Sequence, residues 1–493
     1  MYKIVLRFFV FSLYLYSLLS PVAVFADADA PNIVIILADD MGWNDVGYHG
    51  SEIRTPHIDQ LAADGLQLDR FYAQSTCTPT RAALMTGKSP QSLGIYSPLS
   101  KLNPKGLPPT EKLMPEYLRE VGYQSFLVGK WHLGFRESAY QPLARGFDHF
   151  YGHLTGGIGY WDHVHGGGLD WQRNGKTLRE DGYSTHLMTA EIDRLIKLRD
   201  RSKPMFLYAA FNAPHLPNEA PEETIAQYES IANPNRRIHA AMVGELDAAI
   251  GALIKTLDEQ GMLENTLIWF MSDNGGLNSS AMPAPMVRVS GILQNWLGAP
   301  LPITFLEFMR TNTLDSASDN SPYRKGKQSI YEGGVRVPSF LYWKGKFKPG
   351  LNTQMITVQD VLPTILSAAG IQVLSPQSNL QGVDQWLNLT AGIVSKPRDY
   401  LVNGFDGEAL YRFPWKLLAL SSGEFELYRL DKDPEEFTDV SENHPDIVAE
   451  LQLALEAYPR RESIHIPVWR AAMDMDFFGG KEDRIPWSEI EYQ

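Results

Sequence analysis

Cysteine is almost absent from this chain, whose 493 residues contain only Cys77. A single cysteine excludes an intrachain disulfide and any site built from several thiolates, such as a structural zinc or iron–sulfur centre. Positive charge is also scarce, with 44 Lys and Arg against 58 Asp and Glu and a formal net charge of -14. This acidity argues against a dedicated nucleic-acid-binding protein, which shows a basic face. If the protein binds anions, its cations must gather in one place.

The apolar run at the N-terminus is shorter than the ~20 residues that a membrane span needs. It follows Lys3 and Arg7 and leads to small residues ending at Ala26, which is the pattern of a secretory signal peptide. We therefore predict a signal peptide at residues 1–26, an exported protein and no stable membrane insertion after cleavage. An uncleaved anchor is the alternative. Exported proteins normally use cysteine in disulfides, so Cys77 has another role or is a small buried hydrophobe.

Apolar segments alternate with helical ones along most of the chain. The β-branched run at 32–38 is typical of a strand buried on both faces. Further strands are expected at 66–72, 123–128, 205–211, 267–271 and 337–343, and helices at 58–64 and 238–260. This alternation predicts an α/β fold with a large, mostly parallel sheet flanked by helices on both faces. Ligands then bind at the carboxyl ends of the strands.

The pattern changes after residue 397 to short aromatic-rich segments. They lie at 400–405, 415–420 and 425–430 and are followed by a helix near 445–458. We predict a main domain at 27–397 and a C-terminal subdomain and tail at 398–493 that contains a smaller antiparallel sheet. The long connection at 277–322, which includes Trp296 and Phe305, is expected to border the cleft. The tail around Trp469, Phe477 and Phe478 is a second candidate lid.

The segment around Cys77 predicts an anion pocket. It follows a strand and begins a helix with Pro79 in its first turn. A cysteine at that position faces free backbone N–H groups and the positive end of the helix dipole. Arg81 lies one turn further on the same side, so an anion and a reactive group could meet here. The spacing alone leaves a structural helix cap equally open.

Carboxylates and an amide follow two of the predicted strands. Asp39 and Asp40 end one strand, and Asp273 and Asn274 end another. Adjacent carboxylates repel each other unless a cation intervenes. Four oxygen donors without a histidine cluster favour Ca²⁺ or Mg²⁺ over zinc or copper, although either pair alone could be a helix cap.

Four further residues are candidate functional residues, but each is weak evidence when taken alone. Lys130 and His132 stand two apart just beyond a strand and would point the same way in extended backbone. His215 also follows a strand, and Lys327 lies in a glycine-rich stretch. A solvated loop is the ordinary explanation for each.

Taken together, these segments resemble the type I sulfatase family of the alkaline-phosphatase-like superfamily. The segment from Cys77 to Gly87 fits the family's first signature, and residues 122–132 fit its second. The resemblance runs from about Pro31 to Glu436. It implies that Cys77 is converted to formylglycine by a formylglycine-generating or anaerobic sulfatase-maturating enzyme, with Arg81 holding the hydrate. The implied ligands of one Ca²⁺ ion are Asp39, Asp40, Asp273, Asn274 and the modified Cys77.

The resemblance also implies a reaction, the hydrolysis of a sulfate ester. One hydroxyl of the hydrated aldehyde, polarised by the metal, attacks sulfur and releases the alcohol. Lys130, Lys327 and Arg81 offset the charge on the sulfuryl oxygens. We assign His215, alone or with Lys327, to protonate the leaving oxygen. His132 then deprotonates the second hydroxyl, which expels sulfate and restores the aldehyde.

The expected substrate class comes from a more detailed resemblance to one branch of the family. Residues 147–152 and 160–163 look most like the arylsulfatase B side of the family, which implies 4-O-sulfated galactose or N-acetylgalactosamine in a saccharide. Candidate sugar contacts on this glycine-rich loop are Tyr160, Trp161, His163 and His165. Core packing explains such aromatic residues about as often. The alternatives are a phosphonate or phosphate ester hydrolase of the same superfamily and a sulfated-glycan-binding protein without catalysis. Because related animal lysosomal enzymes carry several cysteines, a bacterial periplasm is the preferred compartment, and the expected location is periplasmic or secreted.

Overall fold

The computed structural model describes residues 30–100, 103–165, 168–278, 317–371, 379–396 and 398–465. The expected signal peptide, residues 279–316 of the predicted cleft connection with Trp296 and Phe305, and the tail with Trp469, Phe477 and Phe478 fall outside the described residues. Within these ranges, no helix combines the length and the apolar character needed to cross a membrane.

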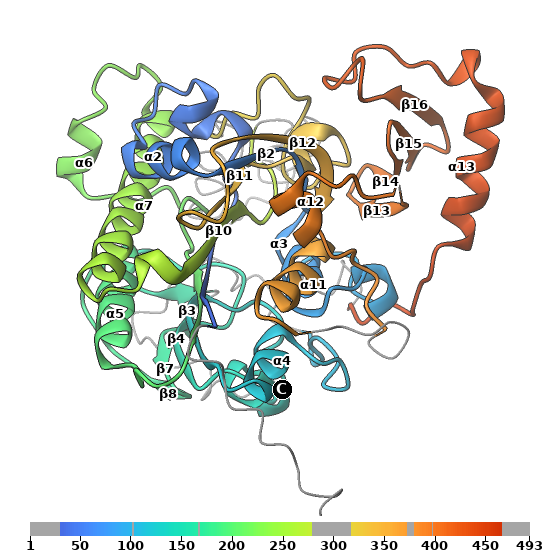
Figure 1. The fold of residues 1–493 in the computed structure, drawn as a ribbon. Helices are drawn as coiled ribbons and strands as arrows, with labels where there is room; N and C mark the ends of the chain where they lie inside the picture. The colour runs from blue at the N-terminus through green and yellow to red at the C-terminus, as the bar shows by residue number, and fades with distance from the viewer. Residues whose placement is uncertain are drawn as a thin grey trace, which may run out of the picture.

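A ten-stranded sheet with helices on both sides forms the centre of the molecule (Figure 1). Its strands are β1 (Asn32–Ala38), β2 (Leu66–Tyr72), β3 (Gln124–Lys130), β4 (His149–His153), β7 (Gln172–Arg173), β8 (Lys176–Thr177), β9 (Met205–Ala210), β10 (Thr266–Ser272), β11 (Ser339–Tyr342) and β12 (Gly350–Thr357). The order is β12-β2-β11-β10-β1-β9-β3-β4-β7-β8. Within this sheet, β7 and β11 run against the other strands. The predicted α/β fold with a mostly parallel sheet is confirmed.

The alternation of side chains in β1 explains the two layers of helices. Ile33, Ile35 and Leu37 lie in one apolar cluster, and Val34 and Ile36 lie in the other. The first cluster includes residues of α3 (Cys77–Thr86), α4 (Met114–Glu120) and α11 (Val358–Ala368). The second includes residues of α2 (Pro56–Asp64), α5 (Ser184–Leu198) and α7 (Pro234–Glu259). Burial on both faces is the reason that β1 has a continuous apolar sequence.

The helix α7 begins four residues before the predicted start. Its N-cap is Asn233, whose side-chain oxygen accepts hydrogen bonds from the backbone N–H groups of Asn235 and Arg236, and Pro234 occupies the first helical position. Apolar periodicity misses this turn because its residues are polar and its stability comes from the cap.

A second, four-stranded antiparallel sheet lies beside the main domain (Figure 1). It consists of β13 (Tyr400–Asn403), β14 (Gly407–Arg412), β15 (Trp415–Leu420) and β16 (Phe425–Arg429), and α13 (Pro445–Ala457) packs against one of its faces. The other face, with Tyr400 and Tyr411, packs on Tyr72 and Ile330 of the main domain. The predicted small sheet and helix are confirmed. Strand β14 was missed because its sequence lacks a clear apolar run.

Buried charges connect the two sheets. The ammonium of Lys416 lies 3.1 Å from Glu332 in α10 (Glu332–Val335) and 2.6 Å from Glu436, and all three side chains are buried. The hydroxyls of Tyr72 and Tyr411 also donate hydrogen bonds to Glu332, at 2.8 and 3.0 Å. The C-terminal sheet is thereby tied to the segment that follows Lys327.

Lys416→Met is expected to lower the free energy of unfolding by about 3–5 kcal/mol, because it removes the buried cation that Glu332 and Glu436 share and leaves only Arg336, at 3.7 Å, beside Glu332. Urea denaturation of the purified protein measures the loss. Lys255→Met is the matched control, since its ammonium is exposed and lies 3.8 Å from Glu259; its expected change is below about 1 kcal/mol. Equal stabilities for the two variants would contradict the prediction.

Candidate active site

The polar strand ends predicted from the sequence meet at the carboxyl edge of the central strands. Asp39 and Asp40 follow β1, and Asp273 and Asn274 follow β10, which pairs with β1 in parallel register through Ala38 and Ser272. The backbone N–H of Asp40 donates a hydrogen bond of 3.2 Å to Asp273 Oδ1. All four side chains are buried. Parallel pairing alone therefore brings these oxygen donors together.

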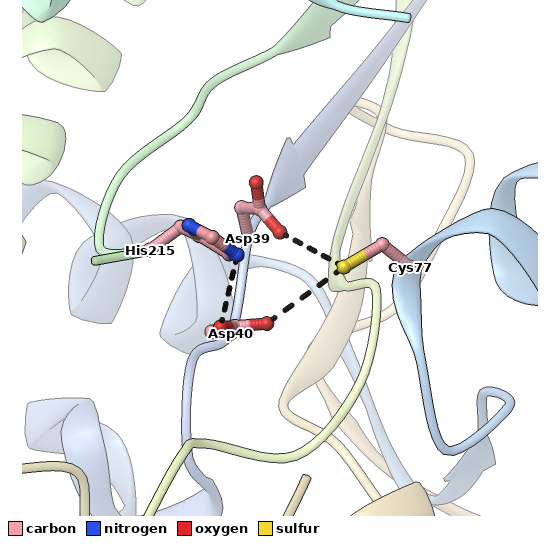
Figure 2. Close-up of side chains that lie close together, drawn as sticks. All are labelled: Asp39, Asp40, Cys77 and His215. Atoms are coloured by element: carbon pink, nitrogen blue, oxygen red, sulfur yellow. Dashed lines mark hydrogen bonds and ion pairs between the residues drawn. The ribbon is translucent and has the colours of Figure 1, made fainter. Parts of the chain in front are cut away.

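Cys77 lies at the start of α3 and faces the same carboxylates (Figure 2). Its Sγ is 3.6 Å from Asp39 Oδ1 and 4.0 Å from Asp40 Oδ1. Burial, followed by the charge of Asp273, raises the pKa of the Cys77 thiol to about 12. Because of these effects the unmodified thiol keeps its proton at neutral pH, despite the nearby cations.

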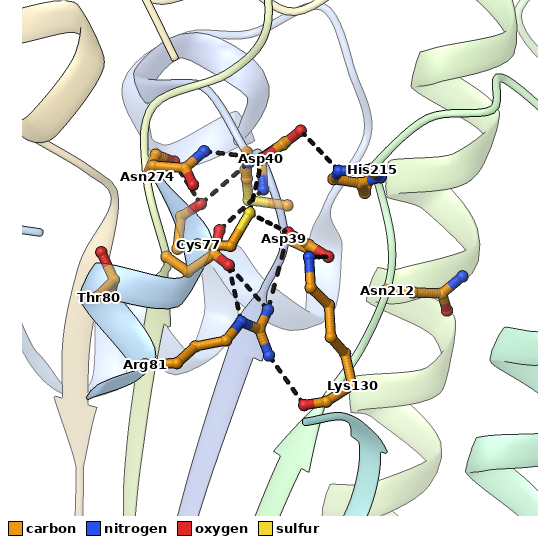
Figure 3. A network of polar contacts seen from close by, with 12 residues as sticks. Asp39, Asp40, Cys77, Thr80, Arg81, Lys130, Asn212, His215 and Asn274 are labelled. Carbon is orange, nitrogen blue, oxygen red and sulfur yellow. Dashed lines mark hydrogen bonds and ion pairs between the residues drawn. The ribbon is translucent and has the colours of Figure 1, made fainter. Parts of the chain in front are cut away.

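Three buried cations surround Cys77 and the carboxylates, and two of them, Arg81 and Lys130, are labelled in Figure 3. Arg81 donates from Nε and Nη2 to Asp273 Oδ2, at 3.0 and 2.8 Å. Lys130 Nζ lies 2.6 Å from Asp39 Oδ2. Lys327 Nζ lies 2.7 Å from Asp40 Oδ2. The positive charge that anion binding requires in this acidic chain is therefore concentrated at this site.

Two histidines border the cluster, and their hydrogen bonds define their tautomers. His132 Nε2 lies 3.0 Å from the carbonyl of Leu99, so Nε2 carries the proton, and Nδ1 is a buried acceptor without a partner among the described residues. His215 Nδ1 donates to the carbonyl of Leu216 at 2.6 Å, and its Nε2 lies 3.6 Å from Asp40 Oδ2.

Burial lowers the pKa of both rings. The pKa of His132 falls well below its usual range, with Lys130 and Arg81 adding to the effect of desolvation. Desolvation, followed by the charge of Lys327, lowers the pKa of His215 to about 3. Both imidazoles are therefore neutral at pH 7 and can accept a proton.

The donor set fits a hard divalent cation. Ligand atoms of Asp39, Asp40, Cys77 and His215 lie within 4.8 Å of one another. Asn274 Oδ1 is buried and has no hydrogen-bond partner among the described residues, although its amide donates to Asp40 Oδ1 at 2.8 Å. Burial and the neighbouring Asp39 raise the pKa of Asp273 to about 6. A bound cation would relieve this repulsion and give the orphaned amide oxygen a partner.

Two of the predicted sugar contacts do not fit that role. Tyr160 is buried, stacks on Tyr183, and places its hydroxyl 2.8 Å from the carbonyls of both Asn212 and His215. His163 is 1% exposed and stacks on Trp171. These rings are core residues that support the loop, whereas Trp161 is 46% exposed. The aromatic sequence pattern could not separate the two environments. The other sugar candidate, His165, donates a hydrogen bond from Nδ1 to the carbonyl oxygen of Gly157, at 2.5 Å.

Sequence reasoning missed two buried polar residues beside the site. His153 ends β4 directly opposite Lys130 in the parallel register, and its Nε2 has no partner among the described residues. Asn212 follows β9, and its amide nitrogen is equally unpartnered within the described chain (Figure 3). Their position after strands of the same sheet was the available signal.

The sulfatase family model matches residues 31–371, a segment that contains every strand of the large sheet. The chain belongs to the sulfatase family. It is 35% identical over 393 residues to arylsulfatase J of Mus musculus, covering 78% of this chain and 60% of that protein. It is 31% identical over 364 residues to N-acetylgalactosamine-6-sulfatase of Homo sapiens, covering 69% of this chain and 62% of that protein. The chain thus matches about 60% of the length of these curated sulfatases.

A solved relative shares the architecture of almost the whole chain. The crystal structure of Ps i-CgsB in complex with k-i-k-neocarrahexaose aligns with a TM-score of 0.77 and 28% identity, covering 91% of this chain and 97% of that one. The similarity to this structure covers more of the chain than the segment matched by the family model. The resemblance to sulfatases seen in the sequence is confirmed.

Proposed function

We propose that this protein hydrolyses the sulfate ester of a sulfated saccharide, using formylglycine at position 77 and one Ca²⁺ ion. The observation that carries the proposal is the convergence of three buried cations, Arg81, Lys130 and Lys327, on Cys77. Such a set suits a sulfuryl group whose charge increases in the transition state. Membership of the sulfatase family supports the reaction type.

The implied groups fit the residues around them. Asp39, Asp40, Asp273 and Asn274 would hold Ca²⁺, which supplies a counter-charge for the carboxylates and polarises the nucleophile. Formylglycine, hydrated, supplies the nucleophilic oxygen that the thiol of Cys77 cannot. Arg81 lies one helical turn from residue 77 and is fixed by Asp273, so it orients the group at that position.

The lysines and histidines of the chain perform the remaining steps. Lys130 and Lys327 bind the sulfuryl oxygens. Burial alone would lower the pKa of Lys327, but Asp40 and the other nearby anions raise it, so Lys327 keeps its proton. His132 would accept, at Nδ1, the proton of the second hydroxyl on residue 77 when sulfate is released. This nitrogen has no other partner among the described residues. His215 protonates the leaving oxygen from Nε2. The negative charge of a bound sulfate ester raises the pKa of His215 and so allows it to carry that proton.

We propose 4-O-sulfated galactose or N-acetylgalactosamine units as the substrate. Two relatives, an N-acetylgalactosamine-6-sulfatase and a protein crystallised with a neocarrahexaose, support a sulfated galactose-type sugar. The exposed ring of Trp161 offers a stacking surface for it. The signal-peptide pattern supports a periplasmic or secreted location, where such polymers are found.

Sulfate release from defined saccharides tests the proposal. The peptide from Phe71 to Arg81 is first shown to have lost roughly 18 Da, the mark of cysteine turned into formylglycine. The panel contains 4-O-sulfated galactose and N-acetylgalactosamine units, 2-, 3- and 6-sulfated controls, an aryl sulfate and an aryl phosphonate. We expect release from the 4-O-sulfated units. No release from any sulfate by the converted enzyme contradicts the proposal, and faster turnover of the phosphonate favours the related phosphonate hydrolase activity.

Calcium is expected to raise the thermal midpoint by about 2–4 °C at a concentration near 100 times its dissociation constant, since it binds only the folded site. Differential scanning calorimetry measures the shift, and a chelator should reverse it. Asn274→Ala removes one proposed ligand and should reduce the shift at the same concentration. An equal shift in both proteins would place the ion elsewhere.

A further inference from the structure

We propose that residues 153–157, which we name the glycine strap, position the two active-site histidines. Gly156 lies against the ring of His132, and Gly157 lies against the ring of His215. Asp170 fixes the strap from the other side. The inference rests on the proposed function and assigns positioning roles to three residues that contact no substrate.

The glycines are needed for close approach. A Cβ built on Gly156 would lie 2.8 Å from both Cε1 and Nε2 of His132. A Cβ on Gly157 would lie 2.9 Å from Cε1 and 3.0 Å from Nδ1 of His215. Three of these four distances are under 3.0 Å, closer than real Cβ atoms approach other atoms, so an alanine at either position would have to displace the ring.

Each imidazole therefore has two restraining contacts, a hydrogen bond and a close glycine. The carbonyl of Leu99 binds His132 Nε2, and Gly156 lies beside the same part of the ring. The carbonyl of Leu216 binds His215 Nδ1, and Gly157 packs on that ring. A displacement of about 1 Å in such groups can reduce a rate by about 10²-fold.

Asp170 explains why the strap stays in place. Its buried carboxylate accepts hydrogen bonds from the backbone N–H of Leu154, at 3.0 and 3.1 Å, and from the N–H of Thr155 at 2.7 Å. The hydroxyl of Thr155 donates to the same carboxylate at 2.5 Å. His153 Nδ1 then donates to the carbonyl of Thr155 at 3.1 Å. These bonds fix the residues immediately before Gly156.

The two glycines should affect different steps, because the proposed roles of the histidines differ. Gly156→Ala displaces His132 and should slow sulfate release by at least about 10-fold, while alcohol release in the first turnover stays fast. Gly157→Ala displaces His215 and should slow alcohol release, more strongly for a sugar than for an aryl leaving group. Rapid-quench measurement of alcohol and of sulfate separates the steps. Gly350→Ala is the matched control, since the nearest atom to its Cβ is 4.0 Å away.

Double variants test whether the glycines act through the histidines. If Gly156 positions His132, then Gly156→Ala should change the rate of a His132→Ala enzyme by less than about twofold. The same holds for Gly157→Ala in a His215→Ala enzyme. Multiplicative losses in either pair would overturn the inference. Asp170→Asn, which places an amide donor against backbone N–H groups, should slow both steps.

A readout without turnover distinguishes this inference from the proposed function. Diethyl pyrocarbonate modifies histidine rings, and peptide mass spectrometry gives the rate at each site. We expect several-fold faster modification of His132 in Gly156→Ala and of His215 in Gly157→Ala, with the other ring unchanged. Unchanged rates in both variants overturn the positioning role. A wild-type protein that hydrolyses no sulfate ester overturns the proposed function whatever these rates show.

Discussion

Cys77→Ala is expected to reduce sulfate release by about 10⁴-fold or more while the fold stays intact. The side chain supplies the position at which the nucleophile forms, and removing a nucleophile has effects of that size. Arg81, Lys130 and Lys327 remain in place, because their ion pairs are with Asp273, Asp39 and Asp40 and not with Cys77. The variant should therefore still bind a sulfated saccharide.

Two measurements separate loss of chemistry from loss of structure in this variant. Sulfate release gives the rate, and isothermal titration with the 4-O-sulfated oligosaccharide gives the affinity, which should stay within a few-fold of the wild type. Met85→Leu, a volume-conserving change in the same buried helix, is the control and should retain turnover. Turnover above about 1% of wild type in Cys77→Ala would remove residue 77 from the reaction.

His132→Ala is expected to lower steady-state turnover by about 10³-fold, the usual range for a general base. Because His132 is assigned to the second half of the reaction, the first turnover should still release one equivalent of alcohol per enzyme. Its Nδ1 has no partner among the described residues, and its lowered pKa keeps the ring neutral, so that the Nδ1 lone pair is free to accept a proton. The expected signature is a burst of alcohol followed by slow sulfate release.

Rapid mixing with an aryl sulfate measures the burst of the His132→Ala enzyme. His186→Ala is the control, because this histidine is on the outer surface of α5 and pairs with Glu245. It should keep both phases of the wild type. If alcohol and sulfate fall together in His132→Ala without a burst, the ring acts in the first step and the roles of His132 and His215 must be exchanged.

The sequence predicted the parts of the site that follow from strand ends. Asp39, Asp40, Asp273 and Asn274 meet because β1 and β10 pair in parallel, and alternation of strands and helices is visible in the residues. The expected concentration of positive charge is present around Cys77. Here local pattern and topology together determine the geometry.

Other features depend on contacts that no local pattern reports. Tyr160 and Trp161 are adjacent, yet the first is buried and the second exposed, because only one side of their loop faces the core. The roles of Gly156 and Gly157 appear only when the rings of His132 and His215 are placed beside them. Asp170 holds a loop about 15 residues away in sequence. Such pairings form in the tertiary structure and leave no periodic signal.

The buried charges between the two sheets limit how this protein can be divided. A chain ending near the predicted boundary at residue 397 would leave Glu332 without Lys416 and expose Tyr72 and Ile330 to water. It would also remove Asp406, which accepts hydrogen bonds from Ser329 and Ile330 just after Lys327. The C-terminal sheet is thus not a separable module for expression or for exchange between homologues. A chimera that keeps its activity has to inherit both sides of this charge cluster from one parent.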